Sequence, residues 1–158
     1  MSLSSEAAGS AKPNATMIKF GYPDSLIREY RHWVVQLRPQ QATLGALVLV
    51  CKDRAAAFSD ISAAAFAELP QAIGDIEAGL TAFRPYQKIN YLMLMMVVPD
   101  VHFHVIPRYA GAQTFEGTTY PDKGWPALPD LAAGVQPAAV AQAALVAGLK
   151  SVWPALRG

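Results

Sequence analysis

The chain has 158 residues and a formal net charge of +1 at pH 7. This length provides one domain with a substantial core and is too short for two comfortable domains. The balanced charge lacks the clustered basic surplus of nucleic-acid-binding domains, so we expect no nucleic-acid partner. The longest apolar run, residues 91–99, is about half of the ~20 residues that a membrane helix needs, so we also expect no membrane partner.

Residues 1–16 are mostly small and polar, and they contain no apolar segment like that of a signal peptide. We therefore predict a flexible leader over 1–16 and a single domain over 17–158. The only cysteine, Cys51, can form no internal disulfide, which is typical of a reducing compartment. A soluble cytoplasmic protein is expected, with Cys51 as a buried and inert thiol, because free cysteine is among the most buried residue types.

Two segments in the first half of the domain have strand character. Residues 26–39, "LIREYRHWVVQLRP", mix polar and apolar residues in the manner of one half-buried strand and stop at Pro39. Residues 44–52, "LGALVLVCK", are apolar on both faces, which indicates a central strand. We predict that these two strands form an antiparallel pair across the short "QQAT" connection.

A helix is predicted to follow, with Ser62 as its cap. Apolar residues recur at spacings of three and four, which is typical of a helix with one buried stripe. These residues are Phe66, Leu69, Ile73, Ile76, Leu80 and Phe83. Pro70 should kink the helix, since proline removes one backbone hydrogen bond and crowds the preceding turn.

The second half contains two further strands and a closing helix. "KINYLMLMMV" and "DVHFHVIPRY" are predicted strands, joined at Val98-Pro99 by a tight hairpin. Residues 110–136 are rich in Gly, Pro, Thr and Asp, which indicates an ordered but irregular wrap. Pro137 suits the first turn of the last helix. The order β-β-α-β-β-α predicts an α+β fold, an antiparallel sheet with packed helices.

The apolar run "YLMLMMVV" predicts self-association. It is more hydrophobic than a one-sided antiparallel strand requires, so we expect both of its faces to be covered. A partner subunit is the natural second cover, and a homodimer is therefore predicted.

Three polar residues with a spacing of two stand beside this run. Side chains at alternate positions of a strand lie on one face, so Asp100, His102 and His104 should point the same way. Their spacing is compatible with three interpretations: polar groups on a solvent-exposed sheet face, a facial set of metal ligands, or a histidine nucleophile oriented through its second ring nitrogen. Spacing alone does not choose between them.

The stretch "VHFHVIPRY" resembles the signature strand of the histidine triad family, which reads His-apolar-His-apolar-His-apolar-apolar and often continues with Pro-Arg. The resemblance extends over residues 20–109. By this match His102 falls on the central, nucleophilic histidine and His104 on the last one. Asp100 stands where the first histidine of the family is found.

The resemblance implies a dimeric α+β fold with a nucleotide pocket at the sheet. It also implies that His102 attacks the α-phosphorus of a nucleoside phosphate derivative and that water hydrolyses the nucleotidyl-histidine. The implied substrates are dinucleoside polyphosphates, phosphoramidates and adenylylated compounds. No cofactor and no metal ligand on the protein are implied. His104 would donate a hydrogen bond to a phosphate oxygen or to the leaving group.

Asp100 departs from the family pattern. An ionised carboxylate accepts hydrogen bonds but does not donate them, it repels phosphate, and it raises the pKa of a neighbouring histidine. Asp100 should therefore weaken catalysis unless its side chain points away from the phosphate. The alternatives are a nucleotide-binding protein of the same fold with little or no turnover and, less favoured, a metal-binding protein that uses Asp100, His102 and His104.

Other positions are weaker candidates for the site. Asn90, Gln36 and Arg108 are predicted nucleotide contacts, Gln36 because the family places an acidic or amide side chain near this position on the ribose hydroxyls. Trp125 is expected to anchor the irregular wrap. His32 is expected to be structural.

Overall fold

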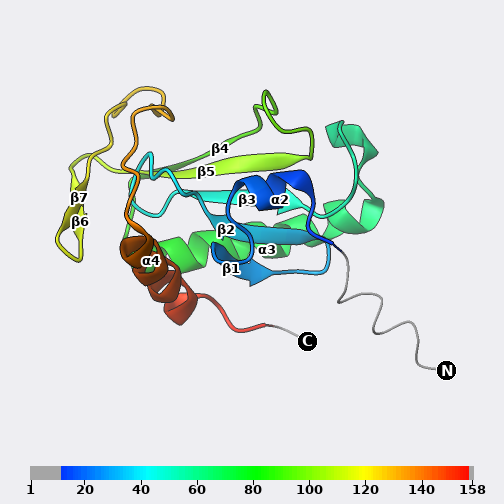
Figure 1. The fold of residues 1–158 in the computed structure, drawn as a ribbon, viewed down its shortest axis with the longest axis horizontal. Coiled ribbons are helices and arrows are strands. Elements are labelled where there is room, and N and C mark those ends of the chain that lie inside the picture. The colour runs from blue at the N-terminus through cyan, green and yellow to red at the C-terminus, as the bar shows by residue number, and fades with distance from the viewer. Residues whose placement is uncertain (1–11, 157–158) are drawn as a thin grey trace.

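The computed structural model describes residues 12–156, which fold around a five-stranded sheet with the order β1-β2-β3-β5-β4 (Figure 1). All four strand pairs are antiparallel, and with the packed helices they confirm the predicted α+β class. The strands of the sheet are β1 (Leu26–Glu29), β2 (Trp33–Leu37), β3 (Leu47–Cys51), β4 (Lys88–Leu92) and β5 (His102–Arg108). The helices are α2 (Ala15–Lys19), α3 (Ala63–Phe83) and α4 (Ala139–Val152), with a 3₁₀ turn at Phe58–Asp60.

The two faces of the sheet are covered by different helices. In Figure 1, α2 lies in front of the sheet and α3 lies behind it. Behind the sheet, Val105 and Phe103 of β5 belong to the main core with residues of α3 and α4. In front, Met17 of α2 packs with Val48 and Val50 of β3. The alternation that was predicted for β5 is therefore present, with Phe103 and Val105 on the core side.

The segment 26–39 is not one strand, as was predicted, but the hairpin of β1 and β2. The Tyr30 amide donates to the Trp33 carbonyl at 2.7 Å and closes the turn. Arg31 and His32 provide the polar residues of this turn, where the chain leaves the sheet. The predicted antiparallel pair with the next strand is confirmed, since β2 and β3 pair from Trp33↔Cys51 to Leu37↔Leu47.

The predicted tight hairpin at Val98-Pro99 is wrong. Pairing of β4 with β5 ends at Leu92↔His104, and residues 93–101 form a loop. Met95 has a φ of 51°, which takes the chain away from the strand direction. The apolar run therefore does not form one long strand covered on both faces: Met96 and Val97 are 86% and 79% exposed. We call residues 93–98 the pocket loop, because most of them line the cavity described below.

Helix α3 begins where the sequence predicted. The Ser62 side chain accepts a hydrogen bond from the Ala65 amide at 3.1 Å, so the predicted cap is confirmed. The helix continues through Pro70 as one segment, and the kink stays a prediction. Its buried face is formed by Ala65, Ala72, Asp75, Ile76, Gly79 and Leu80. Phe66, which was assigned to the buried stripe, is 40% exposed and contacts Phe58 instead.

The irregular segment 110–136 contains a short hairpin, β6 (Gln113–Phe115) and β7 (Thr118–Tyr120), which projects from the sheet at the left of Figure 1. Glu116 and Gly117 both have positive φ, as a two-residue hairpin turn requires. Helix α4 starts two residues after Pro137, so this proline precedes the first turn. Within residues 12–156, no helix is long and apolar enough to cross a bilayer.

The start of the described chain forms the short helix α2, which begins at Ala15, before the leader boundary that the sequence suggested. Residues 1–11 of the predicted leader lie outside the described residues. Asn14 caps α2 by accepting from the Met17 amide, and its side-chain amide donates to the carbonyl of Cys51. Cys51 is fully buried, as was predicted, and burial raises the pKa of its thiol to about 11.

Gly79 gives a stability prediction, because α3 meets the Trp153 ring at this glycine. A Cβ on Gly79 would lie 2.5 Å from Trp153 Cε3. Gly79→Ala should therefore lower the free energy of unfolding by about 1–3 kcal/mol, the usual cost of overpacking. Gly74→Ala in the same helix is the matched control: a Cβ there meets nothing within 4 Å, and it should stabilise by about 0.5–1 kcal/mol. Urea unfolding of both variants checks the prediction, and equal effects would contradict it.

Candidate active site

The site is built on β5, whose register places two imidazoles side by side on the α2 face. His102 pairs with Val50 and His104 with Val48 of β3, and these valines lie on the same face. The imidazoles are 2% and 8% exposed, with ring centroids 5.3 Å apart. Buried polar rings need hydrogen-bond partners, and those partners set the protonation of each ring.

His102 is held by the backbone. Its Nδ1 lies 2.6 Å from the carbonyl oxygen of Asp100. A carbonyl only accepts, so Nδ1 carries the proton of this hydrogen bond. In the neutral ring Nε2 then has the free lone pair, which is the state that a nucleophilic imidazole requires.

His104 is in the opposite tautomer. Arg38 Nε donates to His104 Nδ1 at 3.3 Å, and a guanidinium has no acceptor, so Nδ1 is the unprotonated nitrogen. Nε2 therefore carries the proton and is a hydrogen-bond donor. Burial, followed by the positive charge of Arg38 and the neighbouring His102, lowers the pKa of His104 to about 4. His104 is neutral at physiological pH, where it donates a hydrogen bond rather than a proton.

Helix α2 supplies the roof of the site. Phe20, the residue that follows it, packs against both imidazoles with ring centroids 6.0 Å and 5.8 Å away. Lys19, the last residue of α2, also lines the cavity. This aromatic ring covers part of the histidine face and contributes to the low exposure of both residues.

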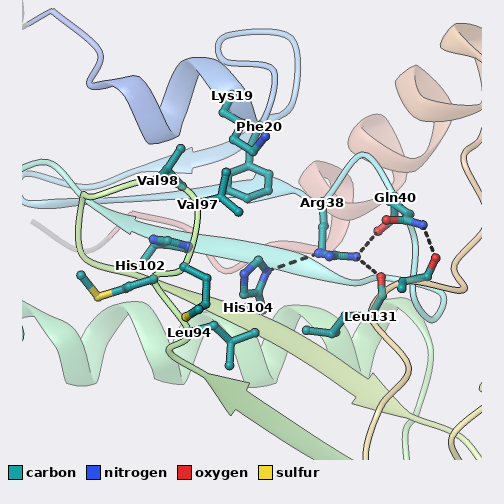
Figure 2. Close-up of a pocket in the computed structure, with 13 residues that line it drawn as sticks. Lys19, Phe20, Arg38, Gln40, Leu94, Val97, Val98, His102, His104 and Leu131 are labelled. Atoms are coloured by element: carbon teal, nitrogen blue, oxygen red, sulfur yellow. Dashed lines mark hydrogen bonds between the residues drawn. The ribbon is translucent and has the colours of Figure 1, made fainter.

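The histidines line a cavity of about 330 Å³, which we call the histidine pocket (Figure 2). Its other lining residues come from α2, the end of β2, the pocket loop and the irregular segment. They are Lys19, Phe20, Arg38, Gln40, Leu94, Met95, Met96, Val97, Val98, Leu131 and Ala132. Two cations stand among mainly apolar groups, and none of these residues is acidic. The arrangement suits an anion that carries an apolar body.

Arg38 is fixed at the pocket wall rather than free to move. Its Nη1 donates to the carbonyl of Gln40 at 2.8 Å and to that of Leu131 at 3.4 Å. Figure 2 shows these bonds together with the bond to His104. The guanidinium therefore joins the end of β2 to the irregular segment and keeps its charge beside His104.

The Asp100 carboxylate does not face the pocket. Its Oδ2 accepts from the Thr16 hydroxyl at 2.9 Å and from the Thr16 amide at 3.2 Å. Asp100 is also absent from the lining of the histidine pocket. Within residues 12–156, no three His, Cys, Asp or Glu residues are grouped closely enough to hold a metal ion, so the triplet Asp100, His102 and His104 is not a ligand set.

The three predicted nucleotide contacts lie apart from the histidine pocket. Gln36 is fully buried and donates to the carbonyl of Met17 and to the Ser25 hydroxyl. Arg108 forms a buried ion pair with Asp122 at 2.7 Å and donates to Asn90 at 2.8 Å. Arg108 and Asn90 line a second cavity over β4.

The two remaining candidates also lie outside the histidine pocket. Trp125 lines the second cavity together with Pro126 and Leu128. His32 Nδ1 lies 4.0 Å from an Asp53 carboxylate oxygen, and the His32 amide donates to Glu68. These contacts fit the structural role that was expected of His32.

Sequence reasoning missed Lys19, Phe20, Arg38 and Leu131. Arg38 had a signal, since it is a charged residue at the end of an apolar strand, next to Pro39. Asn14 is of a residue type that caps helices, and it caps α2. Helix α2 has only five residues, which is too few for an apolar periodicity to show in the sequence. Leu131 lies in an irregular segment, where no sequence pattern predicts a contact.

The structure is similar to solved histidine triad proteins. One from Sinorhizobium meliloti is 19% identical, with a TM-score of 0.70 over 92% of this chain and 98% of that chain. One from Bradyrhizobium japonicum is 17% identical, with a TM-score of 0.64 over 90% and 98%. A hypothetical histidine triad nucleotide-binding protein from Sulfolobus tokodaii is 15% identical, with a TM-score of 0.62 over 87% and 88%. No protein-family model and no curated protein matches the sequence.

The buried state of His104 predicts a pH dependence of stability. Its pKa is about 4 in the folded chain against an ordinary 6.5. As the pH falls below about 6.5, the unfolded chain binds a proton that the folded chain does not, so the free energy of unfolding should fall toward pH 4, by about 3 kcal/mol in total. Urea unfolding of His104→Gln, which stays neutral, should depend less on pH over this interval. An unchanged slope would contradict the assignment.

Proposed function

We propose that this chain, which has the fold of the histidine triad proteins, is a nucleotide hydrolase or transferase that acts at the α-phosphate through a nucleotidyl-His102 intermediate. The observation that carries the proposal is the hydrogen bond of His102 Nδ1 to the Asp100 carbonyl, which leaves Nε2 unprotonated. The cations Lys19 and Arg38 line the same pocket and suit a phosphate. The Sulfolobus protein of this fold is described as nucleotide-binding, which supports the choice of ligand.

The reaction has two steps. The Nε2 lone pair of His102 attacks the α-phosphorus, and the bond from phosphorus to the leaving group breaks, with its electron pair going to the leaving group. The leaving group takes a proton from water. His104 Nε2–H and the Arg38 guanidinium stabilise the charge on the phosphoryl oxygens, which is the largest contribution in many such reactions. Water then attacks phosphorus, the P–N bond breaks, and Nε2 regains its electron pair. The proton that this water releases neutralises the hydroxide left by the first step.

The substrate class follows from the same pocket. The apolar lining suits a nucleobase and ribose body, and the two cations suit one phosphoryl group with its bridging atom. Dinucleoside polyphosphates, phosphoramidates and adenylylated compounds all present such a group. The alternative is a nucleotide-binding protein with little turnover. Asp100 does not favour it, because the carboxylate is bonded to Thr16 and stands away from the phosphate site.

A burst experiment tests the proposal. Adenosine phosphoramidate is mixed with the protein, with and without a chelator, and AMP release is followed from the first turnover. We expect turnover at the same rate with and without the chelator, and a mass increase of one adenylyl group on the peptide that contains His102. Binding of AMP without release from the phosphoramidate would support the binding-protein alternative. Turnover that the chelator abolishes would contradict the mechanism.

His102→Ala should remove hydrolysis and the covalent adduct, because it deletes the attacking nitrogen. The affinity for AMP should stay within about tenfold, or ~1.4 kcal/mol, since the cations and the apolar lining remain. Single-turnover kinetics and calorimetric titration with AMP measure the two quantities. Activity equal to that of the unchanged protein would exclude the covalent mechanism.

The proposal includes a homodimer. β4 is at the end of the sheet, so one edge of its backbone has no neighbouring strand within residues 12–156. An open edge of this kind is available for pairing with another strand. The adjacent Leu94 and Met96 are exposed and would be covered by a partner. Sedimentation at micromolar concentration should show a dimer, and a stable monomer at that concentration would count against it.

A further inference from the structure

We propose that Asp100 is a positioning residue: its carboxylate holds α2 over the two histidines, and this contact sets how tightly the pocket binds its anion. The proposal rests on the proposed function for the identity of that anion. The holding of α2 itself is testable without any ligand.

The contact joins the half-buried Asp100 to the buried Thr16. One oxygen of the Asp100 carboxylate accepts from both the hydroxyl and the amide of Thr16, at 2.9 Å and 3.2 Å. Thr16 is fully buried and is the second residue of α2. Amides in the first turn of a helix have no partner within the helix, so the carboxylate satisfies a group that would otherwise be buried and unpaired. Hydrogen bonds to an ionised acceptor are roughly twice as strong as neutral ones.

The helix depends on such contacts for its position. A helix of five residues is far too short to be stable by itself, so its place on the sheet is set by tertiary contacts. Two further tethers come from other strands: Gln36 of β2 donates to the Met17 carbonyl at 3.0 Å, and Asn14 donates to the carbonyl of Cys51 in β3 at 2.9 Å. Asp100 is the tether from the segment that leads into β5.

The helix delivers two pocket groups to the histidines. Lys19 lines the pocket, and Phe20 packs on both imidazoles. Movement of α2 therefore changes the position of the Lys19 cation beside a bound phosphate and of the Phe20 ring over the imidazoles. Loss of the Asp100 tether should weaken anion binding for this reason.

Asp100 acts through two different groups. Its backbone carbonyl fixes the tautomer of His102, and its carboxylate fixes α2. A substitution removes only the second contact, because every residue has a backbone carbonyl. The side chain should therefore affect the affinity for nucleotide more than the chemical step. This reverses the expectation that Asp100 weakens catalysis. Asp100→His should lower the affinity for nucleotide and should not raise the turnover rate.

Hydrogen exchange tests the tether without ligand. The amides of Ile18 and Phe20 are bonded within α2 and should report its opening. In Asp100→Ala they should exchange at least tenfold faster, while the β3 amides stay unchanged. Asp53→Ala is the matched control, since that carboxylate accepts from the Ser62 amide at 2.7 Å and does not line the histidine pocket. Equal α2 exchange in the unchanged protein and Asp100→Ala would overturn the tether.

Titration with AMP and steady-state kinetics test the consequence for the pocket. Asp100→Ala should raise the Kd for AMP about tenfold with kcat within threefold, and Asp100→Asn, which keeps an acceptor oxygen, should recover most of the affinity. Thr16→Val alone should raise the Kd for AMP about threefold. Added to Asp100→Ala it should raise the Kd no further, because both substitutions remove the same contact.

Unchanged affinity for AMP in Asp100→Ala, or faster turnover by Asp100→His, would overturn the proposal. An unchanged protein that neither binds AMP nor releases it refutes the proposed function, and hydrogen exchange still decides the tether.

Discussion

The strict alternation of β5 is the constraint on which the site depends. Phe103 and Val105 are packed in the core behind the sheet, so His102 and His104 are forced onto the α2 face. A slip of one residue in the pairing with β3 would put both imidazoles into the apolar core and two apolar side chains into the pocket. The register is therefore specified by hydrophobic burial on one face. The same register fixes the positions of His102 and His104 on the other face.

The two histidines differ in tautomer because their partners differ. A backbone carbonyl requires a proton on Nδ1 of His102, whereas a guanidinium requires the lone pair on Nδ1 of His104. One ring presents an acceptor nitrogen and the next presents a donor. His102 is held by the backbone carbonyl of residue 100 and not by its side chain. The Asp100 carboxylate can therefore make other contacts, which it does with Thr16. A carboxylate at this position is therefore compatible with the hydrogen bond that holds His102.

The parts of the fold that were predictable are those governed by periodicity. Alternation in "DVHFHVIPRY" reports burial directly, and the two faces of β5 were predicted correctly. In α3 the cap was predicted correctly but the apolar stripe only in part, since Ile76 and Leu80 are buried whereas Phe66 is 40% exposed. The pocket loop was misread because apolar residues there line a cavity instead of a sheet face, and composition does not distinguish the two. The hairpin of β1 and β2 was missed because "YRH" lacks the Gly, Asn or Asp residues that signal a turn.

The site was predictable only where it coincides with one strand. His102 and His104 are two positions apart, so sequence spacing places them together. Arg38, Phe20 and Leu131 reach the same pocket through tertiary contacts, from residues that are between 27 and 84 positions away from His104. The side chain of Asp100 shares the strand spacing but lies in the segment before β5, where Thr16 offers two donors. Local hydrogen bonding there overrides the simple alternation.

The charge of Arg38 meets two requirements of the proposed function that would otherwise conflict. A nucleophilic pocket needs neutral imidazoles, and a phosphate pocket needs positive charge. Arg38 provides the charge and, through its bond to His104 Nδ1, also disfavours protonation of that ring. A bound phosphate would offset part of this repulsion and raise the pKa of His104 again. The apolar lining strengthens each of these interactions by keeping the local dielectric low. Under the proposed function, anion binding and the proton affinity of His104 would be coupled through a single guanidinium, which the carbonyls of Gln40 and Leu131 hold in place.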